Sequence, residues 1–136
     1  MSKNDNHEKI DAEMELDNMR HSCSHVMAQA VLSMFPEAKL AIGPTIENGF
    51  YYDFELPRTL IPEDLKLIQD KMVKIINEKQ TFERQEMPID EAIALFKKIG
   101  QPYKVELAED LKKARETVVS FYINKNANGE IKFSDM

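Results

Sequence analysis

The segment Ala41-Ile42-Gly43-Pro44-Thr45-Ile46-Glu47-Asn48-Gly49-Phe50-Tyr51-Tyr52-Asp53-Phe54 decides the fold class, because it contains most of a β-hairpin. Residues 39–44 and 50–56 predict two strands, and Asn48-Gly49 between them is a strong turn signal. Gly43-Pro44 predicts a bend rather than a plain central strand, since proline cannot donate a hydrogen bond to a neighbouring strand.

Helical periodicity is found on both sides of this hairpin. Before it, apolar residues recur at helical spacing from about residue 14 to residue 35, and Pro36 ends the predicted helix. After it, we expect helices over residues 62–79, 89–99 and 103–114. Further strands are expected over residues 81–87, 118–123 and 131–133. This order predicts an α+β fold, in which an antiparallel sheet packs with a long helix and shorter helices.

The composition is that of one cytoplasmic globular domain. Hydrophobic residues make up 43% of the 136 residues and charged residues 31%, which is ordinary for a soluble protein. The single cysteine excludes an intrachain disulfide and fits a reducing compartment. We expect no membrane partner, because no apolar run is long enough to span a membrane and the N-terminus does not resemble a signal peptide.

Negative charge is concentrated at the start of the chain. Residues 1–17 carry a net charge of −4, and the whole chain carries −6. We expect residues 1–16 to form a flexible acidic arm and residues 17–136 to form the domain. The last predicted strand lies close to Met136, which suggests a domain truncated at its C-terminal end. With no excess of Lys and Arg, the domain is a poor ligand for phosphate backbones on its own.

His21 and His25 are the first candidates for a functional site. They lie four residues apart in a predicted helix, so both imidazoles can approach one metal ion, one water or one ligand. The alternative is a pair of histidines that pack against or cap the helix. Ser22 occupies the place of the glutamate in a His-Glu-x-x-His motif, which argues against a zinc protease.

Two motifs together resemble the editing domain of threonyl-tRNA synthetases. They are Arg20-His21-Ser22-Cys23-Ser24-His25 and Gly43-Pro44-Thr45-Ile46-Glu47-Asn48-Gly49-Phe50-Tyr51-Tyr52-Asp53. The resemblance runs from about residue 17 to residue 136, through Gln101-Pro102-Tyr103-Lys104 and Phe133-Ser134-Asp135. It implies the fold of the threonyl/alanyl-tRNA synthetase second additional domain. It also implies a hydrolase that removes serine from mischarged tRNA(Thr).

The resemblance implies roles for six residues. His21 and His25 are expected to line the catalytic pocket and position water, and Lys104 to stabilise charge on the ester or the leaving oxygen. Asp135 is expected to orient water or to accept a proton. Gly43 and Tyr52 are expected to bind substrate, through close backbone approach and contact with the adenosine end. The alternatives are a solvated lysine for Lys104, a turn cap for Asp135 and a core aromatic for Tyr52.

One part of the family pattern is absent from this sequence. In the family a Cys-x-x-x-His motif follows the aspartate, whereas this sequence ends at Met136. Only His21 and His25 remain of a four-residue cluster, and zinc usually needs three or four protein ligands. We therefore expect weak or no metal binding at these two histidines, although the intact site could hold zinc. ATP and magnesium would be used only by the absent catalytic core.

The expected partners follow from the same resemblance. They are the serine-charged 3′ end of tRNA(Thr) and the rest of a synthetase chain whose parent forms a homodimer. Alone, the fragment is expected to be inactive. Two alternatives remain, a free-standing factor that hydrolyses mischarged tRNA in trans and a non-catalytic tRNA- or protein-binding module of the same fold.

Overall fold

The computed structural model describes the backbone of residues 3–136 and the side chains of residues 11–136. Its helices are α1 (Lys3–Met34), α2 (Pro62–Asn77), α3 (Ile89–Lys98) and α4 (Pro102–Lys113). Its strands are β1 (Lys39–Leu40), β2 (Thr45–Ile46), β3 (Gly49–Phe50), β4 (Phe54–Glu55), β5 (Thr81–Pro88), β6 (Val118–Lys125) and β7 (Ile131–Asp135). The predicted α+β class with antiparallel strand pairing is confirmed.

Helix α1 is longer than the sequence pattern predicts. It begins at Lys3, whereas the apolar periodicity predicts a start near residue 14; residues 1 and 2 lie outside the described residues. Residues 11–19 are exposed on every side, so this stretch is helical without a packed apolar face. It is rich in Ala, Glu, Met and Leu, which are strong helix formers. A separate acidic arm over residues 1–16 remains a prediction.

The predicted hairpin forms as two short ladders separated by a bend. Strand β1 pairs with β4, and β2 pairs with β3 around a turn at residues 47–48. The strands predicted over residues 39–44 and 50–56 are therefore interrupted. The interruption lies at Gly43 and Tyr52, where the tyrosine ring packs directly on the glycine backbone. The bend that Gly43-Pro44 predicts is confirmed.

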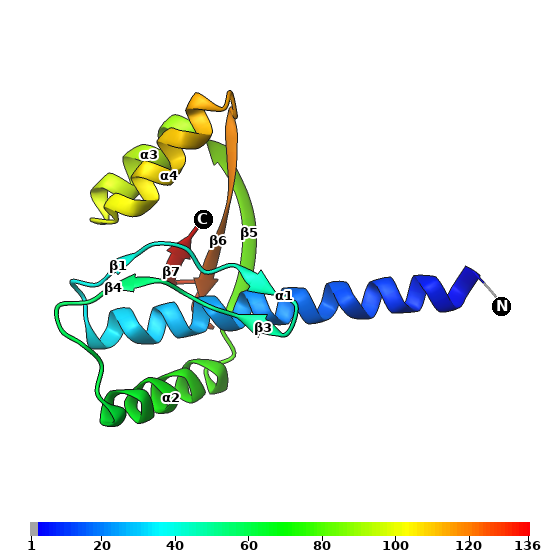
Figure 1. Cartoon of the computed structure of the whole chain (residues 1–136), viewed down its shortest axis with the longest axis horizontal. Helices are drawn as coiled ribbons and strands as arrows, with labels where there is room; N and C mark the ends of the chain where they lie inside the picture. The colour runs from blue at the N-terminus through cyan, green and yellow to red at the C-terminus, as the bar shows by residue number, and fades with distance from the viewer. Residues whose placement is uncertain (1–2) are drawn as a thin grey trace.

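Strands β5, β6 and β7 form an antiparallel sheet in that order. Strand β5 pairs with β6 along its whole length, with Arg84 opposite Tyr122. Strand β7 pairs with the second half of β6, where Tyr122 lies opposite Asp135. Helices α3 and α4 lie between β5 and β6 in sequence and pack at one end of the sheet (Figure 1). This arrangement brings α4 and the end of β7 toward the hairpin.

Three apolar clusters hold these elements together. One joins α1 to α2, and another joins α3 to β6. The cluster that matters most for the site joins α1, the hairpin and β7 through Ala28, Leu40, Tyr52 and Phe133. Phe133 and Asp135 are two residues apart in β7, so their side chains point to the same face of the strand. Packing of Tyr52 in the cluster with Phe133 therefore places Tyr52 near Asp135.

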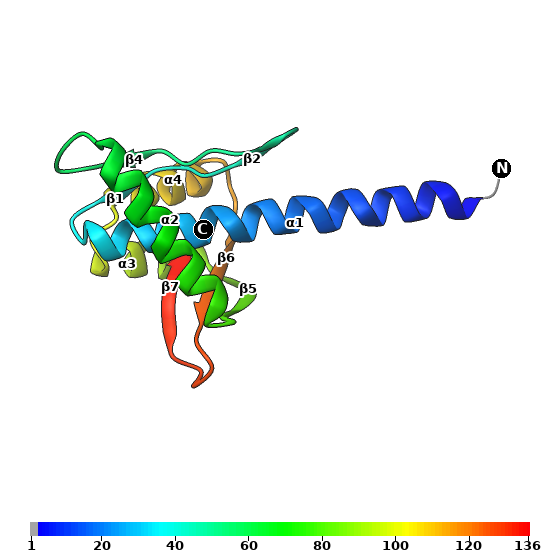
Figure 2. The ribbon, with the colours of Figure 1, turned by 90° about the horizontal axis from the view of Figure 1, so that it is seen from below.

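The hairpin tip runs alongside α1 (Figure 2). The guanidinium of Arg20 donates to the carbonyl oxygen of Glu47 at 2.9 Å and so ties the tip to the helix next to His21. Within residues 3–136, no helix combines the length and the apolar character needed to cross a membrane.

Candidate functional site

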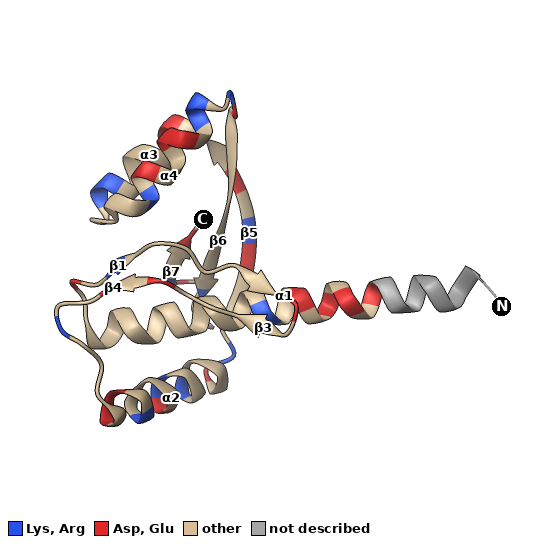
Figure 3. Ribbon diagram, in the orientation of Figure 1, with Lys and Arg blue, Asp and Glu red and all other residues tan. Residues whose placement is uncertain are grey.

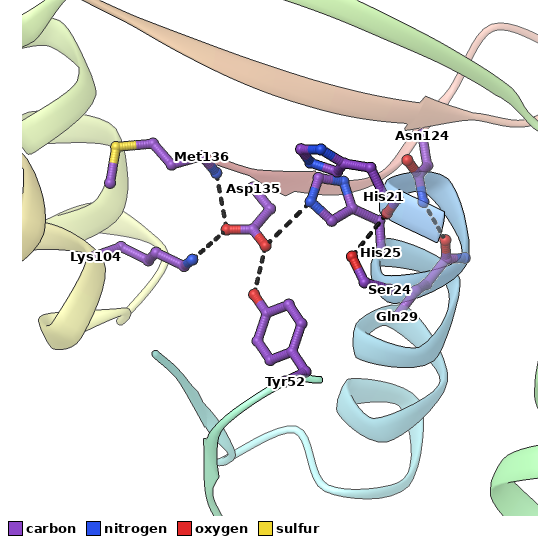
Figure 4. Close-up of polar contacts among 9 residues, drawn as sticks. All are labelled: His21, Ser24, His25, Gln29, Tyr52, Lys104, Asn124, Asp135 and Met136. Atoms are coloured by element: carbon purple, nitrogen blue, oxygen red, sulfur yellow. Dashed lines mark hydrogen bonds and ion pairs between the residues drawn. The ribbon is translucent and has the colours of Figure 1, made fainter. Parts of the chain in front are cut away.

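Asp135 is the centre of a buried polar cluster built from four elements (Figure 4). Nζ of Lys104, from α4, lies 2.7 Å from Oδ1 of Asp135, and the hydroxyl of Tyr52 donates to Oδ2. The backbone N–H of Met136 donates to Oδ1 at 2.8 Å. The side chains of Lys104 and Asp135 are 2% and 1% exposed, so each charge depends on the other for its burial.

His25 completes this cluster from α1. Its Nε2 lies 3.5 Å from Oδ2 of Asp135, and the residue is 3% exposed. Burial lowers the pKa of His25 to about 4, although the negative charge of Asp135 works in the opposite direction. His25 is therefore neutral at pH 7. An ionised carboxylate has about four acceptor positions, and Lys104, Met136, Tyr52 and His25 surround those of Asp135. This arrangement favours an anchoring role for Asp135 over proton acceptance.

His21 lies beside His25 on the same face of α1, as the four-residue spacing predicts. The two rings meet edge to face with centroids 4.6 Å apart. His21 is only half-buried, and burial lowers the pKa of its imidazole below the usual value. Both histidines line a pocket of about 320 Å³, which brings two neutral imidazoles to one accessible cavity.

The opposite wall of this pocket was not predicted from the sequence. It is formed by Phe82 and Arg84 from β5 and by Tyr122 from β6. The ring centroid of Tyr122 lies 4.4 Å from that of His21 and 5.4 Å from that of His25. Alternation along β6 predicts that Tyr122 and Asn124 lie on the same face of the strand. The sequence does not show which face of β6 packs toward α1, because that depends on packing between distant segments.

Tyr52 and Gly43 do not line this pocket but support the cluster behind it. A Cβ on Gly43 would overlap the ring of Tyr52, whose Cγ lies 2.9 Å from that position. Burial, together with Asp135, raises the pKa of Tyr52, so its hydroxyl remains a donor. The close approach seen at Gly43 is therefore to Tyr52, and a direct role of Gly43 toward substrate remains a prediction.

The described residues do not by themselves fit a zinc ion. Among them, no group of three or more His, Cys, Asp or Glu side chains is arranged to hold a metal. His21 and His25 offer two nitrogen ligands, whereas zinc sites in proteins use three or four protein ligands. The carboxylate of Asp135 is already engaged by Lys104 and Tyr52.

Comparison with known proteins identifies the family. No protein-family model matches the chain. The chain is 54% identical over 112 residues to the threonine–tRNA ligase of Dehalococcoides mccartyi strain 195, covering 82% of this chain and 18% of that protein. It is 49% identical over 123 residues to the threonine–tRNA ligase of Clostridium tetani, covering 84% and 19%. It is 52% identical over 103 residues to that of Clostridioides difficile, covering 76% and 16%. The chain thus spans less than a fifth of the length of these relatives, and by sequence it belongs to the threonine–tRNA ligase family as a segment.

Proposed function

We propose that the chain is the editing domain of a threonine–tRNA ligase, which hydrolyses the ester between serine and tRNA(Thr). One observation carries this proposal. An accessible pocket is lined by two neutral histidines, and the second histidine lies against a buried cluster of Lys104, Asp135 and Tyr52. A neutral base at the surface of a pocket with a buried cation behind it suits the hydrolysis of an ester.

His21 is the group best placed to act on water. Hydrolysis requires a water molecule that is held near the carbonyl carbon and loses a proton as it attacks. His21 is half-buried and lines the pocket, and its lowered pKa keeps it in the proton-accepting form at pH 7. We assign His25, which is buried behind it and also neutral, to holding the same water or orienting His21.

Lys104 is the group best suited to stabilise negative charge on oxygen. Its ammonium group has three N–H donors, and one of them points to Asp135 at 2.7 Å. Because Lys104 is buried and is not among the residues that line the pocket, we assign its positive charge, rather than a direct hydrogen bond, to stabilising the ester oxygen or the departing ribose oxygen. Asp135 and Tyr52 then act by holding Lys104 and His25 in place. The carboxylate of Asp135 lies between Lys104 and His25, and the hydroxyl of Tyr52 donates a hydrogen bond to it.

The substrate must be selected against threonine, which differs from serine by one methyl group. A missing methyl group changes binding by only about 1–3 kcal/mol, so the aminoacylation site alone admits serine too often. We propose that the tRNA is held mainly by other parts of the parent ligase, acting in the cytoplasm as a homodimer. The charge of this segment supports that division, because its net charge is −6 and a run of acidic residues lies on α1 upstream of the site (Figure 3).

The test compares hydrolysis of seryl-tRNA(Thr) and threonyl-tRNA(Thr) by a full-length ligase that carries this segment. We expect seryl-tRNA(Thr) to be hydrolysed about 10- to 200-fold faster, the range that one methyl group allows. Equal rates, or no hydrolysis of either, would contradict the proposal. The 136-residue chain is assayed beside it, and its hydrolysis of seryl-tRNA(Thr) would favour a free-standing factor. Binding of tRNA without hydrolysis by either protein would favour a non-catalytic module.

A further inference from the structure

The side chain of Gln101 joins the start of α4 to the hairpin. It is 6% exposed, its Oε1 accepts a hydrogen bond from the backbone N–H of Leu40 at 2.7 Å, and its Nε2 donates to the carbonyl oxygen of Ala38 at 3.3 Å. Strand β1 pairs with β4. The side-chain amide of Gln101 forms hydrogen bonds with the backbone of Leu40, in β1, and of Ala38, the residue just before β1. It thereby stands in for a peptide group of a neighbouring strand.

Gln101 is the residue just before α4, three residues before Lys104. Lys104 and Ala108 are the buried residues of α4. Gln101 thus fixes the start of α4 to β1 about one helical turn before the residue from which Lys104 reaches Asp135. Fixing the backbone here limits where Nζ of Lys104 can lie, because the side chain itself has four rotatable bonds.

Two other polar contacts join this region to the hairpin, and both are exposed. The hydroxyl of Tyr103 donates to Oε2 of Glu55 at 2.8 Å, and Nζ of Lys39 donates to the carbonyl oxygen of Gly100 at 3.2 Å. Exposed polar contacts compete with water and contribute little, whereas a buried N–H left without a partner is costly. Gln101 is the buried link between α4 and β1.

We propose that Gln101 is a positioning residue for Lys104. By tying α4 to β1, it sets the location of the Lys104 ammonium relative to Asp135 and Tyr52. Its expected effect on catalysis rests on the proposed editing function. Its effect on Lys104 does not, so the two can be tested separately.

The structural test follows the side chain of Lys104 by NMR in protein labelled with ¹³C-lysine. Nζ of Lys104 lies 5.5 Å from the centroid of the Tyr52 ring, so its Cε signal should differ from those of exposed lysines. In Gln101→Ala we expect this signal to move toward the exposed group. In Tyr103→Phe, which removes the neighbouring exposed hydrogen bond, we expect no change. A residue that only added stability would leave the Lys104 signal of the folded protein in place.

A second variant covers the case in which Gln101→Ala does not fold. Gln101→Glu keeps an oxygen acceptor for the Leu40 N–H but loses the donor to Ala38. We expect a smaller displacement of the Lys104 signal in this variant. An unchanged signal in folded Gln101→Ala, or in Gln101→Glu where the alanine variant does not fold, overturns the inference.

The catalytic test uses the full-length ligase and seryl-tRNA(Thr). Misplacing a catalytic group by about 1 Å can cost about 100-fold in rate, so we expect a loss of that order in kcat for Gln101→Ala with KM unchanged. Tyr103→Phe should retain the wild-type kcat. A wild-type kcat in Gln101→Ala overturns the inference. A wild-type ligase that does not hydrolyse seryl-tRNA(Thr) overturns the proposed function instead, and the NMR signal then decides the role of Gln101.

Discussion

Nζ of Lys104 lies 2.7 Å from Oδ1 of Asp135, and these two nearly inaccessible side chains connect α4 to the last residue of β7. Tyr52 adds the hairpin to this connection, and His25 adds α1. Four elements that are distant in sequence therefore meet at one carboxylate. Because each member is held by the others, substitutions here should affect stability as well as activity.

Lys104→Met should lower the free energy of unfolding strongly. Removing one partner of a buried ion pair leaves an uncompensated charge and typically costs about 3–5 kcal/mol. Lys112→Met is a matched control, because Nζ of Lys112 lies at the same 2.7 Å from Asp90 but both side chains are exposed. That control should lose less than about 1 kcal/mol. Urea denaturation of both variants measures the difference, and equal losses would contradict the burial argument.

The neutrality of His25 should appear in the pH dependence of stability. The pKa of His25 is 6.5 without the protein environment and about 4 in the folded chain, so between these values the unfolded chain binds more protons. The free energy of unfolding should therefore fall as pH drops from 6.5 to 4, by up to about 3 kcal/mol from this residue. Above pH 6.5 the contribution is constant. Stability of the wild type and of His25→Gln, measured across this range, should converge as pH falls. Parallel curves would show that His25 is not buried in neutral form.

Gly43→Ala should disturb the cluster through Tyr52. The added methyl group would overlap the tyrosine ring and displace the hydroxyl from Asp135. Overpacking of this kind typically costs about 1–3 kcal/mol. The same substitution in a Tyr52→Ala background should cost much less, because the ring is no longer present. A thermal denaturation cycle over the four proteins tests this, and additive losses would indicate that Gly43 acts independently of Tyr52.

Local sequence patterns predicted most elements but few of the contacts between them. Turn residues and periodicity predict the hairpin turn, α2, the end of α3 before Gly100 and the exposed strand β5. The shared face of His21 and His25 follows from their spacing. The meeting of Tyr52 with Asp135 across 83 residues depends on how the hairpin packs against β7, which no local pattern contains. Tyr122 was missed for the same reason. The early part of α1 was missed because residues 11–19 are exposed and present no packed apolar face.

The editing assignment is tested most directly by serine release from seryl-tRNA(Thr) in a full-length ligase carrying His21→Ala. Met19→Ala on the same helix is the matched control, because Met19 is exposed and does not line the pocket. Loss of a general base typically costs about 100- to 10,000-fold, so His21→Ala should release serine that much more slowly while Met19→Ala matches the wild type. Serine release at the wild-type rate by His21→Ala would contradict the account.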